Sequence, residues 1–299
     1  MRVEPVLVSL GTLSVAIGVG ALVLAGCGHG GDRATVQSGG RCGDEDQLAL
    51  VPDTYRDGSR VVLPVVFPDG TRAELTYPPE LAVAELGVFP YSSGSLRGRS
   101  PIPGRGDTVG RDFWVRCGEL SDVRSLRNDG RQPALLAEYK GADGQAVGLW
   151  KLRANDPAHY LGFKFGRWAV LVYDYVGAGA MTDPEPASWA ASFSGRETGE
   201  GFLILEGTGP LRLARAREHA GPELVFAAGN PTRDLALFPG ECRAHRDQTR
   251  LINGKHVQWS GGFADWCLSN SMRIHASGPS DFVGAVIRKV AVRNVTIAS

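Results

Sequence analysis

Residues 60–77 read RVVLPVVFPDGTRAELTY and predict a β-hairpin. Two strand-like runs, 60–67 and 72–77, flank the turn Pro68-Asp69-Gly70-Thr71. Proline presets the first dihedral angle of such a turn, and the Asp-Gly pair supplies the positive φ that tight turns need. Pro64 interrupts the first run. Because proline cannot donate a ladder hydrogen bond, we expect an edge position or a bulge there.

Turn-forming residues also separate apolar runs in the rest of the chain, since its 40 Gly and 18 Pro are spread between short apolar runs. That pattern is typical of many strands joined by turns. The sequence therefore predicts a mainly β fold of antiparallel sheets, either sandwich-like or made of two β-rich halves, 42–180 and 181–299, with one core or two. We expect strands at 113–117, 133–139, 146–153, 160–165, 168–175, 202–205, 211–213, 223–226, 234–238, 255–261, 263–268 and 272–276.

One helix is predicted, near 183–194. Thr182-Asp183-Pro184-Glu185 is a capping box with proline in the first turn. Trp189, Ala190 and Phe193 then recur at helical spacing, and Gly195 can end the helix.

Two further segments have their own character. Residues 91–110, YSSGSLRGRSPIPGRGDTVG, have no apolar period and predict a long loop. The last apolar run, from Phe282 to Ile297, predicts a strand near its end, with a slip of the alternation at Arg293-Asn294.

The N-terminal segment predicts export and lipidation. No residue from Val6 to Leu24 is charged, and Leu24-Ala25-Gly26-Cys27 matches a bacterial lipobox. We expect a lipoprotein signal peptide over 1–26, lipidation of Cys27 and a flexible Gly-rich tether over 27–41. The alternative is an uncleaved membrane helix. Both interpretations place the body outside the membrane, and the first predicts the outer face of the cytoplasmic membrane, facing the cell wall.

The balance of charged residues limits the classes of partner that the chain can bind. The chain has 32 basic and 32 acidic residues. A nucleic-acid binder needs a basic face to displace counterions, so this balance argues against nucleic acid as a partner.

Five cysteines are present, and Cys27 is the predicted lipid site. The remaining four are an even number, which in an oxidising compartment indicates two disulfides. Three pairings are possible, and we prefer Cys42–Cys117 and Cys242–Cys267 because each closes within one half of the chain. A metal site is the alternative, but no Cys-x-x-Cys or Cys-x-x-His spacing supports it. We expect no metal and no cofactor.

Candidate functional residues are few. The stretch WSGGFADWC, 259–267, places Trp259 and Trp266 beside a predicted disulfide, where exposed indole rings bind sugars or proteins. The alternative is that both rings pack on the disulfide as a small core. No G-x-S-x-G or H-E-x-x-H motif occurs, so no catalytic residue is assigned. A glycosidase-like pair of catalytic carboxylates is still possible. The candidates lie near predicted strand ends and are Glu119, Glu138, Asp174 and Glu206.

Two stretches resemble a known family. FPDGTRAELTYPPELAVAELGVFPY, 67–91, and MTDPEPASWAASFSGRETGEGFLILEGTGPLRLA, 181–214, together with the lipobox, are similar to uncharacterised secreted lipoproteins of high-GC Gram-positive (actinobacterial) type. This resemblance implies an exported, β-rich protein, and it implies no activity and no site residues.

Two functional hypotheses follow. The first is a non-catalytic, membrane-anchored lipoprotein that binds a cell-wall glycan or a protein partner. The second is a secreted, glycosidase-like hydrolase that uses a carboxylate pair.

Overall fold

A computed structural model describes residues 40–42, 49–96, 109–120, 134–151, 159–173, 185–209, 211–216, 221–228, 233–240, 242, 249–269 and 271–298. The chain divides into two units, Met1–Thr35 and Val36–Ser299, and all the described residues belong to the second. The predicted signal peptide, Cys27 and most of the predicted tether lie outside the described residues. No helix among the described residues is long and apolar enough to cross a membrane.

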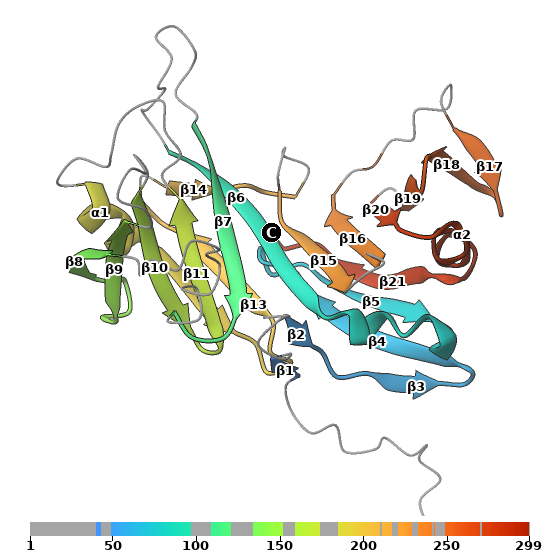
Figure 1. Cartoon of the computed structure of the whole chain (residues 1–299), viewed down its shortest axis with the longest axis horizontal. Helices are drawn as coiled ribbons and strands as arrows, with labels where there is room; N and C mark the ends of the chain where they lie inside the picture. The colour runs from blue at the N-terminus through green and yellow to red at the C-terminus, as the bar shows by residue number, and fades with distance from the viewer. Residues whose placement is uncertain are drawn as a thin grey trace, which may run out of the picture. The chain divides into compact units, whose positions relative to one another are not determined.

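The fold is mainly β, as the sequence predicts, and its strands pair antiparallel. Fifteen of the described strands form the largest sheet, in the order β17-β18-β19-β20-β16-β15-β6-β7-β11-β10-β9-β8 with three short strands beside this path (Figure 1). The bounds along the path are β17 Arg250–Ile252, β18 Lys255–Ser260, β19 Phe263–Ser269, β20 Met272–Ser277, β16 Arg233–Pro239, β15 Glu223–Ala228, β6 Val88–Leu96, β7 Val109–Cys117, β11 Trp168–Tyr173, β10 His159–Phe165, β9 Ala146–Lys151 and β8 Ala134–Lys140, and the short strands are β1 Arg41–Cys42, β2 Leu50–Val51 and β14 Leu211–Leu213.

Strand β6 joins the two parts of this sheet. Its first residues, Val88 to Tyr91, pair with β15, and its last, Ser92 to Leu96, pair with β7 (Figure 1). The sequence predicts a loop over 91–110, so the prediction is wrong for 91–96 and for the two residues that begin β7. A polar Ser/Gly-rich run can form a strand when neighbours on both sides supply hydrogen bonds, because tertiary pairing overrides weak propensity.

The predicted hairpin at 60–77 lies in a second sheet, of order β21-β5-β4-β3. At its turn, Phe67 N–H donates to Thr71 O at 2.8 Å, and Gly70 has a φ of 88°. Pro64 lies beyond the end of β3, where β4 has only β5 as a partner, so its missing N–H breaks no ladder bond. The strands are β3 Tyr55–Asp57, β4 Arg60–Val66, β5 Arg72–Tyr77 and β21 Ala291–Thr296.

A third, two-stranded sheet follows the predicted helix. Helix α1 spans Glu185–Ser192, inside the predicted 183–194, and leads directly into β12, Phe193–Glu197, which pairs with β13, Leu203–Gly207. Two 3-10 turns, η1 Pro79–Leu81 and η2 Val83–Leu86, follow β5.

A second α-helix, α2 at Ser280–Lys289, corrects the sequence prediction, which has one helix and assigns none to the run 282–297. Phe282, Val283 and Val286 recur at helical spacing and are all buried. The aromatic Phe282 and the β-branched Val283 and Val286 are residue types that strands favour, and the contacts of this segment with β19 and β20 stabilise the helix instead. The predicted final strand is present as β21, and its register shifts between Arg293 and Thr296, next to the predicted slip.

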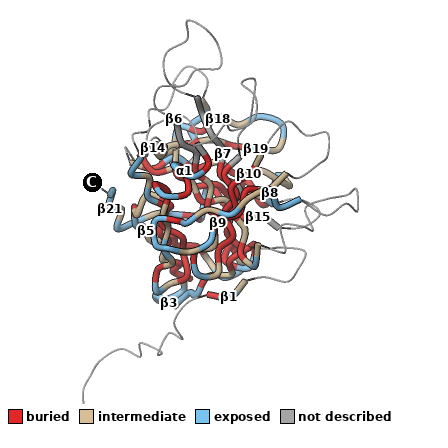
Figure 2. Tube along the Cα trace, turned by 90° about the vertical axis from the view of Figure 1, so that its left-hand side faces the viewer, coloured by how far each residue is buried: buried red, intermediate tan, exposed pale blue. Residues whose placement is uncertain are grey.

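One core serves both predicted halves. Most of the buried apolar residues form one cluster that includes Phe113 and Trp168 from the first half and Phe226 and Ile274 from the second, and Tyr160, Ala169 and Leu171 form a small second cluster. Figure 2 shows the buried residues, in red, concentrated in the interior of the trace. A sheet that spans both halves therefore rests on a shared core.

Candidate functional site

One face of the strands β19, β20, β16 and β15 carries an unusual group of side chains. Successive strand residues point to opposite faces, so Trp266, Ile274 and Leu237 point into the core and are buried. The alternate residues form the opposite face, which we call the outer face. It comprises Phe263, Asp265, Arg273, His275, Ser277, Asp234, Phe238 and Glu223.

Neighbouring strands are tied across this face by polar pairs. Asp265 is the register partner of His275, and Nδ1 of His275 lies 3.1 Å from Oδ2 of Asp265. A carboxylate only accepts hydrogen bonds, so the ring nitrogen is the donor. This hydrogen bond raises the pKa of His275 against the opposing effect of burial. Asp234 pairs in register with Ser277, whose hydroxyl donates to Oδ2 of Asp234 at 3.0 Å.

Aromatic rings complete the outer face. Phe263, which is 38% exposed, stacks on His275 with 5.9 Å between ring centroids and 24° between planes. The Arg273 guanidinium lies 4.1 Å from the ring centroid of its register partner Phe238, a close cation–π contact. The aromatic rings and charged side chains of the outer face are therefore in direct contact with one another.

Glu223 is the most perturbed acid of the outer face. Burial raises the pKa of its carboxyl to about 7, against the positive charges of Arg273 and His275, which lower it. Among the described residues its carboxylate makes no recorded hydrogen bond or ion pair that would offset the burial. A carboxyl of this kind exists near neutral pH in both acidic and basic forms, as functional-site acids do. Sequence reasoning missed it, because the perturbation arises from packing and not from a motif.

The two tryptophans predicted to bind point toward the core, away from the outer face. Trp266 is 2% exposed and belongs to the main core, so its ring cannot stack on a ligand. Lys255 Nζ lies 5.9 Å from the centroid of that ring. Trp259 is half-buried and packs against the main core. The stretch 259–267 does contribute to the outer face, but through Phe263 and Asp265.

Both preferred disulfides are present, Cys42–Cys117 with a Cα–Cα distance of 5.5 Å and Cys242–Cys267 with 5.6 Å. Disulfides are typical of proteins outside the reducing cytoplasm. The second adjoins the outer face, since Cys267 is the register partner of Arg273. The described residues contain no group of three or more His, Cys, Asp or Glu side chains that could hold a metal ion.

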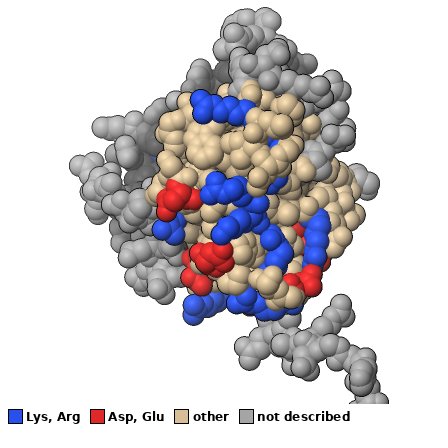
Figure 3. Space-filling view, turned by 90° about the vertical axis from the view of Figure 1, so that its right-hand side faces the viewer, with Lys and Arg blue, Asp and Glu red and all other residues tan. Residues whose placement is uncertain are grey.

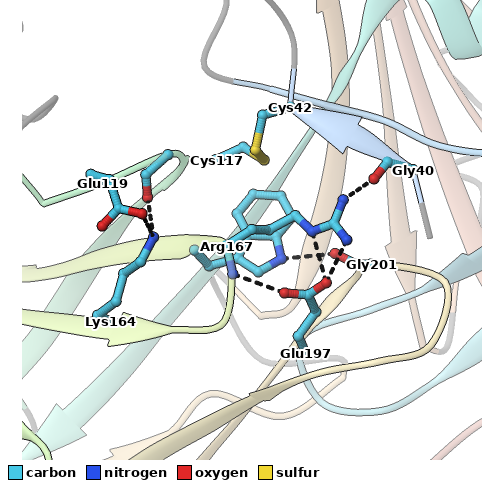
Figure 4. The surroundings of a disulfide bond; sticks show 10 residues. Gly40, Cys42, Cys117, Glu119, Lys164, Arg167, Glu197 and Gly201 are labelled. Carbon is cyan, nitrogen blue, oxygen red and sulfur yellow. Dashed lines mark hydrogen bonds and ion pairs between the residues drawn. A yellow bond between two sulfur atoms is a disulfide. The ribbon is translucent and has the colours of Figure 1, made fainter. Parts of the chain in front are cut away.

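The surroundings of the first disulfide are structural (Figure 4). Arg167 binds Glu197 through Nε and Nη2, each 2.7 Å from Oε1, and its Nη1 donates to the Gly40 carbonyl. These contacts fix the start of the described chain beside the turn between β10 and β11.

The four acids predicted as hydrolase candidates are not gathered by these contacts. Glu119 is 70% exposed and pairs with Lys164 at 3.0 Å beside the first disulfide (Figure 4). Glu138 on β8 and Glu206 on β13 are exposed, and Asp174 lies outside the described residues. No carboxylate pair is therefore assigned among them.

Figure 3 shows basic side chains on the side of the molecule that lies to the right in Figure 1. This view faces the side of the molecule with β17, β18 and α2, and Lys and Arg side chains gather across it with acidic side chains set among them. Among the described ion pairs are Lys289 with Glu80 at 2.8 Å and Arg293 with Glu74 at 2.8 Å. Exposed pairs of this kind contribute little to stability, and we assign this surface no function.

Comparisons with known proteins give no family. No protein-family model and no curated protein matches the chain. Among solved structures, a chain of "The complex structure of Pseudomonas aeruginosa MucA/MucB" is similar at 10% identity, covering 79% of this chain and 90% of that one, with a TM-score of 0.16. A TM-score this low supports no conclusion about fold or function.

Proposed function

We propose that this chain is a non-catalytic, membrane-anchored extracytoplasmic lipoprotein, attached through Cys27, that binds a cell-wall component. The lipobox at 24–27 supports the anchor, and the two disulfides support the compartment. The outer face is the proposed binding surface.

The observation that carries this proposal is the preorganisation of the outer face. The Phe263 ring stacks on His275, and the Arg273 guanidinium stacks on the Phe238 ring. Both Phe263 and Arg273 are nevertheless exposed. Side chains that are already fixed lose little conformational entropy when a partner binds, which favours binding over a purely structural role.

Co-sedimentation with purified cell walls tests the proposal. The full-length chain in detergent is expected to sediment with intact walls, and Phe263→Ala and Arg273→Ala are each expected to weaken the binding about tenfold, the loss of one good interfacial contact. Arg250→Ala, on the edge strand β17, is the matched control and should bind like the wild type. Equal binding of all four proteins, or no sedimentation of the wild type, would overturn the proposal.

A hydrolase is the second candidate, and the raised pKa of Glu223 is the observation that favours it. An acid with a pKa of about 7 can protonate a leaving group at neutral pH. Release of soluble sugars from the same wall preparation by the wild type, abolished by Glu223→Gln, would establish this alternative and exclude the non-catalytic assignment.

A further inference from the structure

No side chain or carbonyl among the described residues accepts a hydrogen bond from Arg273. It is exposed on β20, and the Phe238 ring holds one side of its guanidinium. Nor does it form an ion pair within that part of the chain. A guanidinium has five N–H donors in a planar fork that matches a carboxylate, and cation–π stacking leaves the edge of the fork free.

The positive charge of Arg273 lowers the pKa of Glu223, so the two groups are near each other, but they do not form an ion pair. A full ion pair would satisfy both groups, so their separation leaves a charged position open to a ligand. The charged and titratable groups on the strands around Glu223 include Arg273 and His275 on β20, Tyr91 opposite it on β6, Asp265 on β19, Arg233 and Asp234 on β16 and Arg116 on β7.

We propose that the outer face binds an oligosaccharide bearing a carboxylate, with the carboxylate on Arg273 and a sugar ring on Phe263. This inference rests on the proposed function, because it names the ligand of the same surface. Residue 273 and the register position of Phe263, at 277, are four residues apart on β20, or about 13 Å at about 3.3 Å per residue. That span is longer than a single sugar ring and therefore suits an oligosaccharide.

The chemistry of the face favours a singly charged acidic sugar. Exposed aromatic faces suit the apolar faces of sugar rings, and a bidentate Arg–carboxylate contact is strong. A phosphate, which carries up to two charges, would meet stronger repulsion from Asp234 and Asp265. An acidic peptide offers the carboxylate but not the flat apolar ring for Phe263.

Binding is then coupled to a proton on Glu223. An ionised Glu223 repels the ligand carboxylate, so the binding-competent form is the protonated one. With a pKa of about 7, Glu223 is protonated in about nine-tenths of molecules at pH 6 and one-tenth at pH 8. The dissociation constant should therefore be about tenfold smaller at pH 6 than at pH 8. Protonation of His275 at lower pH acts in the same direction.

Isothermal titration calorimetry of the full-length chain in detergent tests this inference, with tetragalacturonic acid as the probe. Titrations at pH 6, 7 and 8, each in two buffers of different ionisation enthalpy, measure affinity and proton uptake together. We expect net proton uptake at pH 7 and about tenfold tighter binding at pH 6 than at pH 8. Glu223→Gln should bind as tightly at pH 8 as at pH 6, apart from the contribution of His275, and Arg273→Ala should lose binding.

Controls separate the alternatives. Arg250→Ala should behave as the wild type, and circular dichroism confirms that every variant folds. Cellotetraose, which is neutral, and tetra-aspartate, which is an acidic peptide, should not bind. Binding of either as tight as that of the acidic sugar overturns the assignment, as does tetragalacturonate binding that survives Arg273→Ala. Absence of tetragalacturonate binding by a chain that still sediments with cell walls refutes this inference and leaves the proposed function standing.

Discussion

His275 and Asp265 face each other across β19 and β20, with Nδ1 of the ring 3.1 Å from Oδ2 of the carboxylate. The pair lies at the centre of the outer face, between the Phe263 ring and Arg273. Because Phe263 stacks on the same imidazole, the position of the ring depends on an acid and an aromatic residue together.

Asp265→Asn should remove the charge that holds the proton on His275. The raised pKa of His275 means that the pair contributes stability below the unfolded value of about 6.5, and that this contribution is lost as the pH rises through the folded pKa. The variant should therefore be less stable at pH 5, by up to about 1 kcal/mol, and equal to the wild type at pH 9. Urea denaturation at the two pH values measures the difference. A loss of equal size at both pH values would contradict an ionic origin.

Glu223→Gln should stabilise the folded chain above neutral pH. The pKa of Glu223 is raised to about 7 in the fold, so stability present below pH 4.5 is lost as the pH rises toward 7. Because the side chain is partly exposed, we expect a discounted gain of about 1–2 kcal/mol at pH 8 and none at pH 4. Urea denaturation at these two pH values is the measurement. Glu206→Gln, an exposed acid on β13, is the control and should change stability at neither pH.

The two disulfides should differ in their contributions to stability. Replacing both cysteines of a pair by serine removes a closed loop, of sequence separation 75 for Cys42–Cys117 and 25 for Cys242–Cys267. Chain entropy predicts losses of about 4 and about 3 kcal/mol. Guanidinium denaturation of the two double variants measures both, and each serves as the control for the other. A larger loss for the shorter loop would contradict the entropic explanation.

Helix α2 should depend on its apolar side. Ile287 is fully buried, so Ile287→Ala should cost about 2–5 kcal/mol through lost packing and a residual cavity. Asp281→Ala, on the exposed first turn, is the matched control and should cost less than about 1 kcal/mol, mainly through the helix dipole. Thermal unfolding followed by circular dichroism compares the two, and similar losses would contradict the helix packing.

Cys27→Ala should abolish lipid attachment. If the lipobox is cleaved and Cys27 carries the acyl chains, the variant should fail to label with a fatty-acid analogue and should keep an uncleaved N-terminus, so that it migrates more slowly than the wild type. The wild type should label with a fatty-acid analogue. A variant that migrates like the wild type would favour the uncleaved membrane helix.

Local sequence patterns predicted the elements whose signals are local. The turn Pro68-Asp69-Gly70-Thr71 strongly favours one backbone conformation. The capping box before α1 indicates a helix start independently of its tertiary surroundings. The disulfide pairing was predicted for a different reason, because each bond closes within one half of the chain. The turn and the helix start depend on few residues close together in the chain.

The bridging strand, the second helix and the outer face depend on contacts between distant residues. Strand β6 is Ser/Gly-rich after Tyr91 and becomes a strand because β15 and β7 pair with its two ends. The segment 282–289 has side chains suited equally to strand or helix, and its neighbours decide. The perturbation of Glu223 arises from burial beside residues some 50 positions later in the chain, which no spacing in the sequence indicates.

The Cys42–Cys117 disulfide also determines how the body would carry mechanical load. Tension entering from the N-terminal side reaches Cys42 on β1, a strand of only two residues, Arg41–Cys42, that could otherwise peel from β2. The covalent bond passes that force directly to the end of β7, a strand held between β6 and β11. Strands held on both sides resist pulling through many hydrogen bonds at once. A chain tethered at its N-terminus could thus be strained without unravelling from that end.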